Sequence, residues 1–243
     1  MIFRRIFLVA YFATFVCFAE SEPNGNADIQ PFVDWLLKDG ERLDSVRFAE
    51  VAEAVSGCAV LPVVPSDVVH AAMLTHLEAT LDAMLTDLAE PGNPIHEVGR
   101  VNEISRHIED YLLAHLNLEG VYECLIPLTA SGQTQRSGYP DLLLRDIESG
   151  RVFYIDPKVY KSGSEGSSFR TFYFEPKRAT NKILDDASHL IVGIAHGGKV
   201  DGLWQLESWK VVDLFDFRVR LKAEFQSSNR ELYKDTAVLL QSE

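Results

Sequence analysis

The chain lacks the motifs of several common enzyme classes. Its 243 residues include three cysteines and seven histidines, none of them in a Cys-x-x-Cys pair or a Cys/His cluster. No Gly-x-Ser-x-Gly elbow and no Gly-Lys-Ser/Thr phosphate loop occurs. Without these patterns, a zinc-binding protein, a serine hydrolase and a P-loop NTPase are all disfavoured.

The chain also lacks the overall basic charge of a protein that coats nucleic acid. Its formal net charge is −13, and the stretch from Glu20 to Asp110 holds eighteen acidic but only five basic residues. The stretch from Lys158 to Lys182 is the opposite, with six basic and two acidic residues. A polyanion should therefore bind locally at this cationic stretch, with the acidic remainder turned away. A solvated basic patch is the alternative.

The apolar run near the N-terminus is too short for a membrane span. The run from Ile6 to Ala19 is shorter than the ~20 residues that cross a bilayer. It follows Arg4 and Arg5 and gives way to a polar segment, which is typical of a secretory signal peptide over residues 1–19. We therefore expect an exported protein, with a retained membrane anchor as the alternative. In an oxidising compartment Cys58 and Cys124 either pair or stay free.

The order of the expected elements is that of a mixed α/β protein. Apolar spacing, caps and chain breakers predict helices over 29–38, 43–55 and 66–89 (with Ser66 as N-cap), and a fourth helix that ends near Leu116. Strands are predicted over 121–128, 169–174, 190–195 and 203–214, with a turn at Gly197-Gly198. Further helices are predicted over 180–189, 217–227 and 230–240.

The rest of this order is arranged around a β-hairpin between Gly138 and Lys161. Two apolar runs, 142–147 and 152–155, flank a short segment that contains Gly150. Because strand side chains alternate between faces, Asp156 and Lys158 should share one side. Asp141 opens the first strand, at the end that lies beside Asp156 when the hairpin pairs. Two carboxylates of this kind suit Mg²⁺, and the lysine can orient a water or stabilise charge on a phosphate.

Pro140-Asp141, a spacer and Asp156-Pro157-Lys158 together resemble the PD-(D/E)XK signature of restriction-endonuclease-like nucleases. The resemblance covers about residues 99–213. It implies an α/β fold: a restriction-endonuclease-like mixed sheet flanked by helices, with an N-terminal helical extension. Residues 1–19 are then a signal peptide, 20–94 a helical part of the same domain, and 95–243 the nuclease core with C-terminal helices. An ordinary exposed hairpin, with a solvated Asp156–Lys158 pair, is the alternative.

Nucleases of this superfamily carry a glutamate on the helix before the sheet, and the chain offers two candidates. Glu109 has the spacing to the next strand that the resemblance implies, and Glu103 follows a plausible 99–102 segment. Six residues turn a helix by about 240°, so the two cannot serve one site equally. We favour Glu109 and keep Glu103 as the alternative.

The expected activity is metal-dependent hydrolysis of phosphodiester bonds in DNA. Asp141 and Asp156, joined by Glu109, would bind one or two Mg²⁺ ions (or Mn²⁺), while Lys158 would position the attacking water. The residues expected to bind double-stranded DNA are those of the cationic stretch: Lys161, Arg170, Lys177, Arg178 and Lys182. The resemblance also implies a homodimer. The alternative is an inactive nucleic-acid-binding or partner-binding protein on the same scaffold, which Pro157 in the motif strand would favour.

Overall fold

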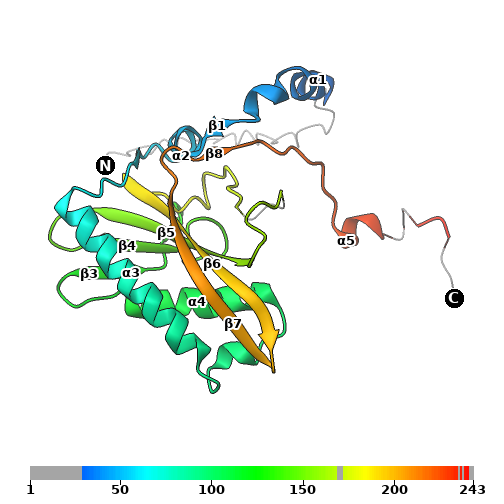
Figure 1. Ribbon diagram of the computed structural model, residues 1–243. Helices are drawn as coiled ribbons and strands as arrows, with labels where there is room; N and C mark the ends of the chain where they lie inside the picture. Colours follow the sequence, from blue (N-terminus) through cyan, green and yellow to red (C-terminus); the bar gives the residue numbers. More distant parts are fainter. Residues whose placement is uncertain (1–28, 169–171, 235, 237, 241–243) are drawn as a thin grey trace, which may run out of the picture. The chain divides into compact units, whose positions relative to one another are not determined.

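The computed structural model describes residues 29–168, 172–234, 236 and 238–240 (Figure 1). The expected signal peptide over 1–19 and the expected DNA-binding residue Arg170 lie outside these residues. The chain divides into two units, one ending at Glu41 and the other running from Arg42 onward. In the first unit, α1 (Ile29–Asp39) confirms the helix expected over 29–38. Among the described residues, no helix is long and apolar enough to cross a membrane.

A six-stranded mixed sheet forms the centre of the second unit. Its strands are β2 (Val60–Leu61), β3 (Tyr122–Leu125), β4 (Leu142–Asp146), β5 (Val152–Lys161), β6 (Ala187–Val200) and β7 (Leu203–Asp213), in the order β2-β6-β5-β4-β3, with β7 also paired to β6. The pairs β3–β4, β4–β5 and β6–β7 are antiparallel, whereas β2–β6 and β5–β6 are parallel. A two-stranded sheet pairs β1 (Val46–Arg47) with β8 (Arg218–Val219). The expected mixed α/β fold is confirmed.

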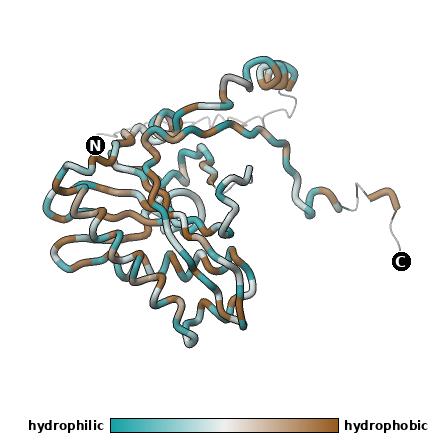
Figure 2. The backbone as a smooth tube through the Cα atoms, in the orientation of Figure 1, coloured by the Kyte–Doolittle hydropathy of each residue, from teal (hydrophilic) through white to brown (hydrophobic). Residues whose placement is uncertain are grey.

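Helices cover this sheet because its strands are hydrophobic on both faces. The helical segments of the second unit are α2 (Phe48–Ser56), α3 (Val68–Ala89), η2 (Pro94–His96), α4 (Val101–His115) and α5 (Asn229–Leu232), and η1 (Gly40–Leu43) spans the boundary between the units. Figure 1 shows α3 and α4 packed across the strands. Figure 2 shows that hydrophobic residues recur along the strands.

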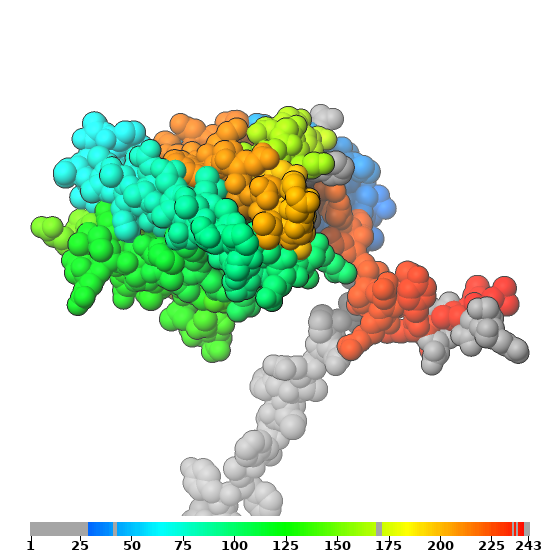
Figure 3. Space-filling model, turned by 60° about the horizontal axis from the view of Figure 1, so that its bottom comes forward, coloured from blue at the N-terminus to red at the C-terminus, as the bar shows by residue number. Residues whose placement is uncertain are grey.

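The two faces of the sheet carry separate hydrophobic clusters. Phe153 and Ile155 of β5 pack with buried residues of α3 and α4, such as Met73 and Ile108. Tyr154, which points to the opposite face, packs in a second cluster with Phe48 of α2. In Figure 3, α3 lies along the surface beside β7. The sheet is therefore covered on both faces, and this fixes the face to which each side chain of β5 points.

Two local details differ from the sequence-based predictions, and one open alternative is decided. The N-cap of α3 is Asp67 and not Ser66, because the Asp67 carboxylate accepts hydrogen bonds from the backbone N–H groups of Val69 and His70. The helix expected over 43–55 begins only at Phe48. Both Cys58 and Cys124 are free thiols, so no disulfide joins them.

The helix expected over 180–189 is wrong. Residues 181–186 are irregular, and β6 begins at Ala187. The backbone N–H groups of Leu184 and Asp185 donate to the hydroxyl of Tyr154 in place of helical carbonyls. A tertiary contact therefore satisfies these donors, which overrides the local helical pattern.

Beyond residue 168, the strands expected over 190–195 and 203–214 are confirmed as parts of β6 and β7, but other predictions are wrong. Residues 172–174 form no strand, and 169–171 are not described. Gly197 and Gly198 lie inside β6, where the register with β7 shifts, and the chain turns instead at Asp201 and Gly202, both with positive φ. The C-terminal helices over 217–227 and 230–240 are absent from the described residues except for α5. A short helix whose apolar side chains meet no partner is only marginally stable.

Candidate active site

The expected hairpin forms, and its ends bring the motif together. Leu142 of β4 pairs with Ile155 of β5. Asp141 immediately precedes Leu142 and Asp156 immediately follows Ile155, so both lie at the same end of the β4–β5 pair. β5 continues to Lys161 beside β6, beyond the segment that pairs with β4. Pro157 lies on this extension, paired with Val192 in a register that runs without a shift along β5 and β6. Because this part of β5 has no β4 partner, it is an edge on that side, and proline is tolerated on edges.

The two carboxylates and the ammonium converge as the sequence predicted. The Nζ atom of Lys158 lies 3.7 Å from Oδ2 of Asp141 and forms an ion pair with Oδ2 of Asp156. Asp156 is buried, with 1% of its surface exposed. The Asp141 and Lys158 side chains are 14% and 24% exposed. The Asp156–Lys158 ion pair is therefore largely buried and is not a solvated pair on the free surface.

Burial and the repulsion between Asp141 and Asp156 make it unfavourable for both carboxylates to be charged at once. The pKa of Asp156 is raised to about 7, first by burial and then by the neighbouring charge of Asp141, against the lowering effect of Lys158. Burial lowers the pKa of Lys158, but the charges of Asp156 and Asp141 raise it above its usual value. Oδ2 of Asp156 is buried and has no hydrogen-bond partner of satisfactory geometry despite its ion pair with Lys158. A site of this kind favours an additional cation.

Of the two glutamates on α4, Glu109 is near enough to Asp141 to be affected by its charge, whereas Glu103 lies at the start of the helix. The pKa of Glu109 is raised by burial and by the charge of Asp141, which shows that the two carboxylates lie within electrostatic range. Glu103 instead accepts hydrogen bonds from the backbone N–H groups of Gly99 and Arg100 and caps the start of α4. Because six residues turn a helix by about 240°, the two glutamates point in different directions and have different neighbours.

The loop before the motif adds an arginine that the sequence alone did not place. Nη1 of Arg136 lies 2.7 Å from Oδ1 of Asp110 and 3.9 Å from Oε2 of Glu109. The pair links the 129–138 loop to α4. No local sequence signal predicts this contact, since the residues are 26 or more positions apart.

The residues expected to bind DNA do not share one environment. Lys161, Lys177 and Arg178 are exposed, and Lys177 forms an ion pair with Glu175 at 2.8 Å. Lys182 is only 1% exposed, so its expected place on the DNA-binding surface is not supported by the structure. The cationic stretch therefore divides into a surface part and a buried residue.

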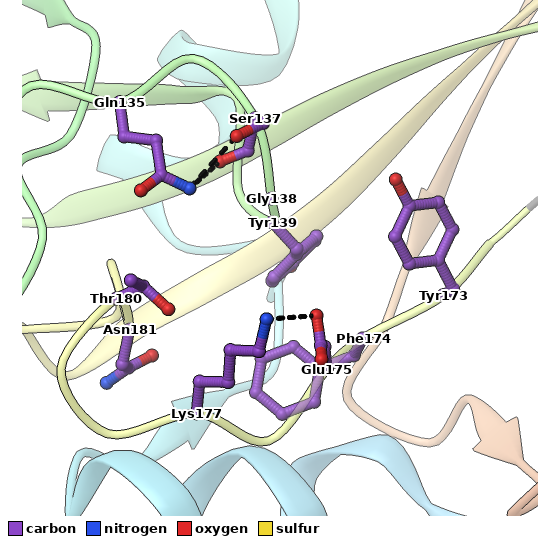
Figure 4. Close-up of a pocket in the computed structure, with 10 residues that line it drawn as sticks. All are labelled: Gln135, Ser137, Gly138, Tyr139, Tyr173, Phe174, Glu175, Lys177, Thr180 and Asn181. Carbon is purple, nitrogen blue, oxygen red and sulfur yellow. Dashed lines mark hydrogen bonds and ion pairs between the residues drawn. The ribbon is translucent and has the colours of Figure 1, made fainter. Parts of the chain in front are cut away.

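A pocket of about 200 Å³ adjoins the motif and is shown in Figure 4. Its lining comes from the segment before Asp141 and from the segment before Lys182: Gln135, Ser137, Gly138, Tyr139, Tyr173, Phe174, Glu175, Lys177, Thr180 and Asn181. The Tyr139 hydroxyl lies 2.7 Å from Nδ1 of the buried His189, which ties this wall to β6. Sequence reasoning did not single out Tyr139 or His189 for this contact.

The donor set is compatible with a hard divalent cation held by few protein ligands. Among the described residues, no group of three or more His, Cys, Asp or Glu side chains is arranged as a complete metal site. Asp141 and Asp156 supply carboxylate oxygens, and Glu109 lies within electrostatic range. Mg²⁺ commonly binds through one or two carboxylates, with water and substrate phosphate completing its shell. The two carboxylates fit such an ion, since the buried Oδ2 of Asp156 has an ion pair with Lys158 but no hydrogen bond.

Two comparisons with known proteins point to the same family. The model of the type II restriction enzyme MjaV family matches residues 42–236. A relative described as type II restriction enzyme MjaV, from Methanocaldococcus jannaschii, is 28% identical over 214 residues, which cover 83% of this chain and 90% of the relative. No solved structure matches the chain significantly.

Proposed function

The chain belongs to the type II restriction enzyme MjaV family, and from this premise we propose that it is an endonuclease that hydrolyses phosphodiester bonds in DNA. The observation that carries the proposal is the meeting of Lys158 with Asp141 and Asp156 at one end of the β4–β5 hairpin. The resemblance to restriction enzymes rests on the same residues, so motif and family agree.

We propose that Asp141 and Asp156 hold a divalent metal ion, with Glu109 joining directly or through water. Mg²⁺ is the expected ion, as one or two ions, and Mn²⁺ is the alternative. When bound, the metal stabilises negative charge on the phosphate oxygens and lowers the pKa of coordinated water. The support is the mutual repulsion of the two carboxylates, which raises the pKa of the buried Asp156 and which a bound cation would relieve. Carboxylate oxygens are also the ligands that Mg²⁺ prefers.

In this proposal Lys158 has the second chemical role. Its ammonium donates hydrogen bonds, so it can orient the attacking water or a phosphate oxygen beside the carboxylates. Water forms the new bond to phosphorus, the bond from phosphorus to one ester oxygen breaks, and that oxygen leaves with a proton. Arg136 keeps the 129–138 loop against α4 beside this centre.

Finer proposals concern the substrate and the assembly. The exposed Lys161, Lys177 and Arg178 are proposed to contact the phosphates of double-stranded DNA. Because one hydrolytic centre cuts one strand at a time, we propose a homodimer for a double-strand break. We also propose that residues 1–19 direct export, on the basis of their signal-peptide pattern.

The deciding experiment is incubation of the purified protein with supercoiled plasmid in Mg²⁺, in Mn²⁺ and in EDTA. We expect nicked and linear products with either metal and none in EDTA. Asp156→Asn, of the same shape but without the charge, should remove cleavage while the circular dichroism spectrum stays unchanged. Cleavage in EDTA, or cleavage by Asp156→Asn at the wild-type rate, would contradict the proposed site. DNA binding without any cutting would favour the inactive binding protein.

A further inference from the structure

Gln135 lines the pocket beside the motif, and its side-chain amide is held in one orientation. Its Nε2 atom donates two hydrogen bonds of 3.0 Å, one to the carbonyl and one to the hydroxyl of Ser137. A backbone carbonyl can only accept a hydrogen bond, so the end of the amide that faces Ser137 is the nitrogen. The other end, the oxygen Oε1, is therefore turned away from Ser137. Among the described residues, no group donates a hydrogen bond to this oxygen.

The second amide of the pocket and its charged groups already have partners. Both ends of the Asn181 amide bind the backbone of Ile183: Nδ2 donates to the carbonyl at 2.9 Å, and Oδ1 accepts from the N–H at 3.2 Å. The Glu175 carboxylate forms an ion pair of 2.8 Å with Lys177. Figure 4 shows Gln135 on one wall of the pocket and these residues on the other. Gln135 is thus the lining amide that keeps an oxygen for a ligand.

The backbone of Gln135 is fixed beside the proposed centre. Its carbonyl accepts a 3.2 Å hydrogen bond from Nζ of the buried Lys182. The next residue, Arg136, contacts Asp110 at 2.7 Å and lies 3.9 Å from Oε2 of Glu109. Because both the backbone and the amide are held before a ligand binds, little ordering entropy is lost on binding. An acceptor fixed in this way can discriminate between hydrogen-bonding partners.

A fixed acceptor distinguishes the four bases of DNA by hydrogen bonding alone. In the major groove, adenine and cytosine each present an exocyclic amino group, which donates, whereas guanine and thymine present only acceptors. An amide oxygen pairs with the first two bases. Opposite the other two it stays unpaired, which costs the free energy of its lost hydration. Contacts of this kind to base edges specify sequence, whereas contacts to phosphates only position the protein.

We propose that Gln135 is a specificity-determining residue whose Oε1 accepts a hydrogen bond from the exocyclic amino group of an adenine or a cytosine near the bond that is cut. Ser137 is its positioning partner, because it holds the amide nitrogen and so fixes which end meets the base. The inference rests on the proposed function, since it requires DNA at this site. It extends that function by assigning a preference at one base position.

The test is cleavage of a duplex DNA library with randomised bases by the full chain in Mg²⁺, followed by sequencing of the cut ends. We expect the wild type to favour adenine or cytosine about tenfold at one position near the cut, and the sequences themselves distinguish the two bases. Gln135→Met has a similar length but no acceptor, so it should lose this preference and keep those at other positions. Gln133→Met is the matched control, because Gln133 is exposed in the same loop but does not line the pocket. It should cut with the wild-type preference.

The outcomes separate this inference from the proposed function. If the wild type cuts no DNA, the proposed function fails and the inference falls with it. If the wild type cuts but Gln135→Met keeps the same preference at every position, the amide does not read a base. A position that changes but favoured guanine or thymine would also overturn the inference. Should Gln135→Met fail to fold or to cut, Gln135→Leu takes its place. If neither variant cuts, Gln135 does more than read sequence and the inference is overturned.

Discussion

Nζ of Lys158 lies 3.7 Å from Oδ2 of Asp141, although Lys158 is on β5 and Asp141 immediately precedes β4. The contact exists because β4 and β5 pair in the register that puts Leu142 opposite Ile155. A slip of one residue would turn Asp156 and Lys158 to the other face of the sheet. The register of one hairpin therefore decides whether a site exists, and the first predictions concern that site.

Replacing Asp141 by Asn should reduce DNA cleavage in Mg²⁺ by about a hundredfold or more, because a neutral amide binds the metal poorly. The rate is measured on supercoiled plasmid under single-turnover conditions. Asp146→Asn, on the same strand β4 but at its other end, is the matched control and should cleave as wild type does. Equal rates in Asp141→Asn and wild type would remove Asp141 from the site.

The two glutamates of α4 should separate activity from stability. Glu109→Gln should slow cleavage with little change in melting temperature. Glu103→Gln should leave cleavage intact but cost about 1 kcal/mol of unfolding free energy, because it weakens the cap at Gly99 and Arg100. Cleavage assays and urea titrations of both variants test the assignment. The reverse pattern would make Glu103 the residue of the site.

The exposed part of the cationic stretch should contribute to DNA affinity through phosphates alone. Lys161→Ala and Arg178→Ala should each weaken binding similarly for unrelated sequences, and each should reduce the slope of log affinity against log salt by about one. Fluorescence anisotropy with a 30-base-pair duplex (a length of about 100 Å) in Ca²⁺ measures both quantities. A salt slope identical to that of wild type in both variants would place DNA on another surface.

The buried His189 should make the protein less stable as the pH falls. Burial lowers its pKa to about 3. Its unfolded value is about 6.5, so its contribution is complete above that pH and is lost as the pH falls toward 3. Between pH 6.5 and 5 the wild type should lose about 2 kcal/mol more unfolding free energy than His189→Phe. Urea unfolding at the two pH values measures this, and equal losses would contradict a neutral buried imidazole.

Export should leave a mature chain that begins at Glu20. Intact-mass measurement of protein recovered from the exported fraction of an expressing cell tests this, and a variant with Phe7, Leu8 and Val9 changed to Lys is the control that should stay inside. Recovery of the chain only inside the cell, with residues 1–19 still attached, would end the proposal of a cleaved signal.

The sequence by itself determined the hairpin and the meeting of its charged residues. The reason is that the features involved are local. The break at Gly150 sets the strand pairing, and strand alternation puts Asp156 and Lys158 on one side. The long helix α3 was equally readable from its apolar spacing, since its buried residues include Met73, Leu77 and Leu81.

Only the tertiary structure decided the choices that depend on distant neighbours. Glu109 and Glu103 carry the same group on the same helix, and only the packing of α4 brings the first to Asp141. Lys182 is a surface cation by the sequence pattern, yet it is buried and its ammonium donates to the carbonyl of Gln135 in the 129–138 loop. Likewise the 181–186 segment is not a helix, because the hydroxyl of Tyr154 takes its backbone donors. In each case the deciding partner is far along the chain, where no local pattern records it.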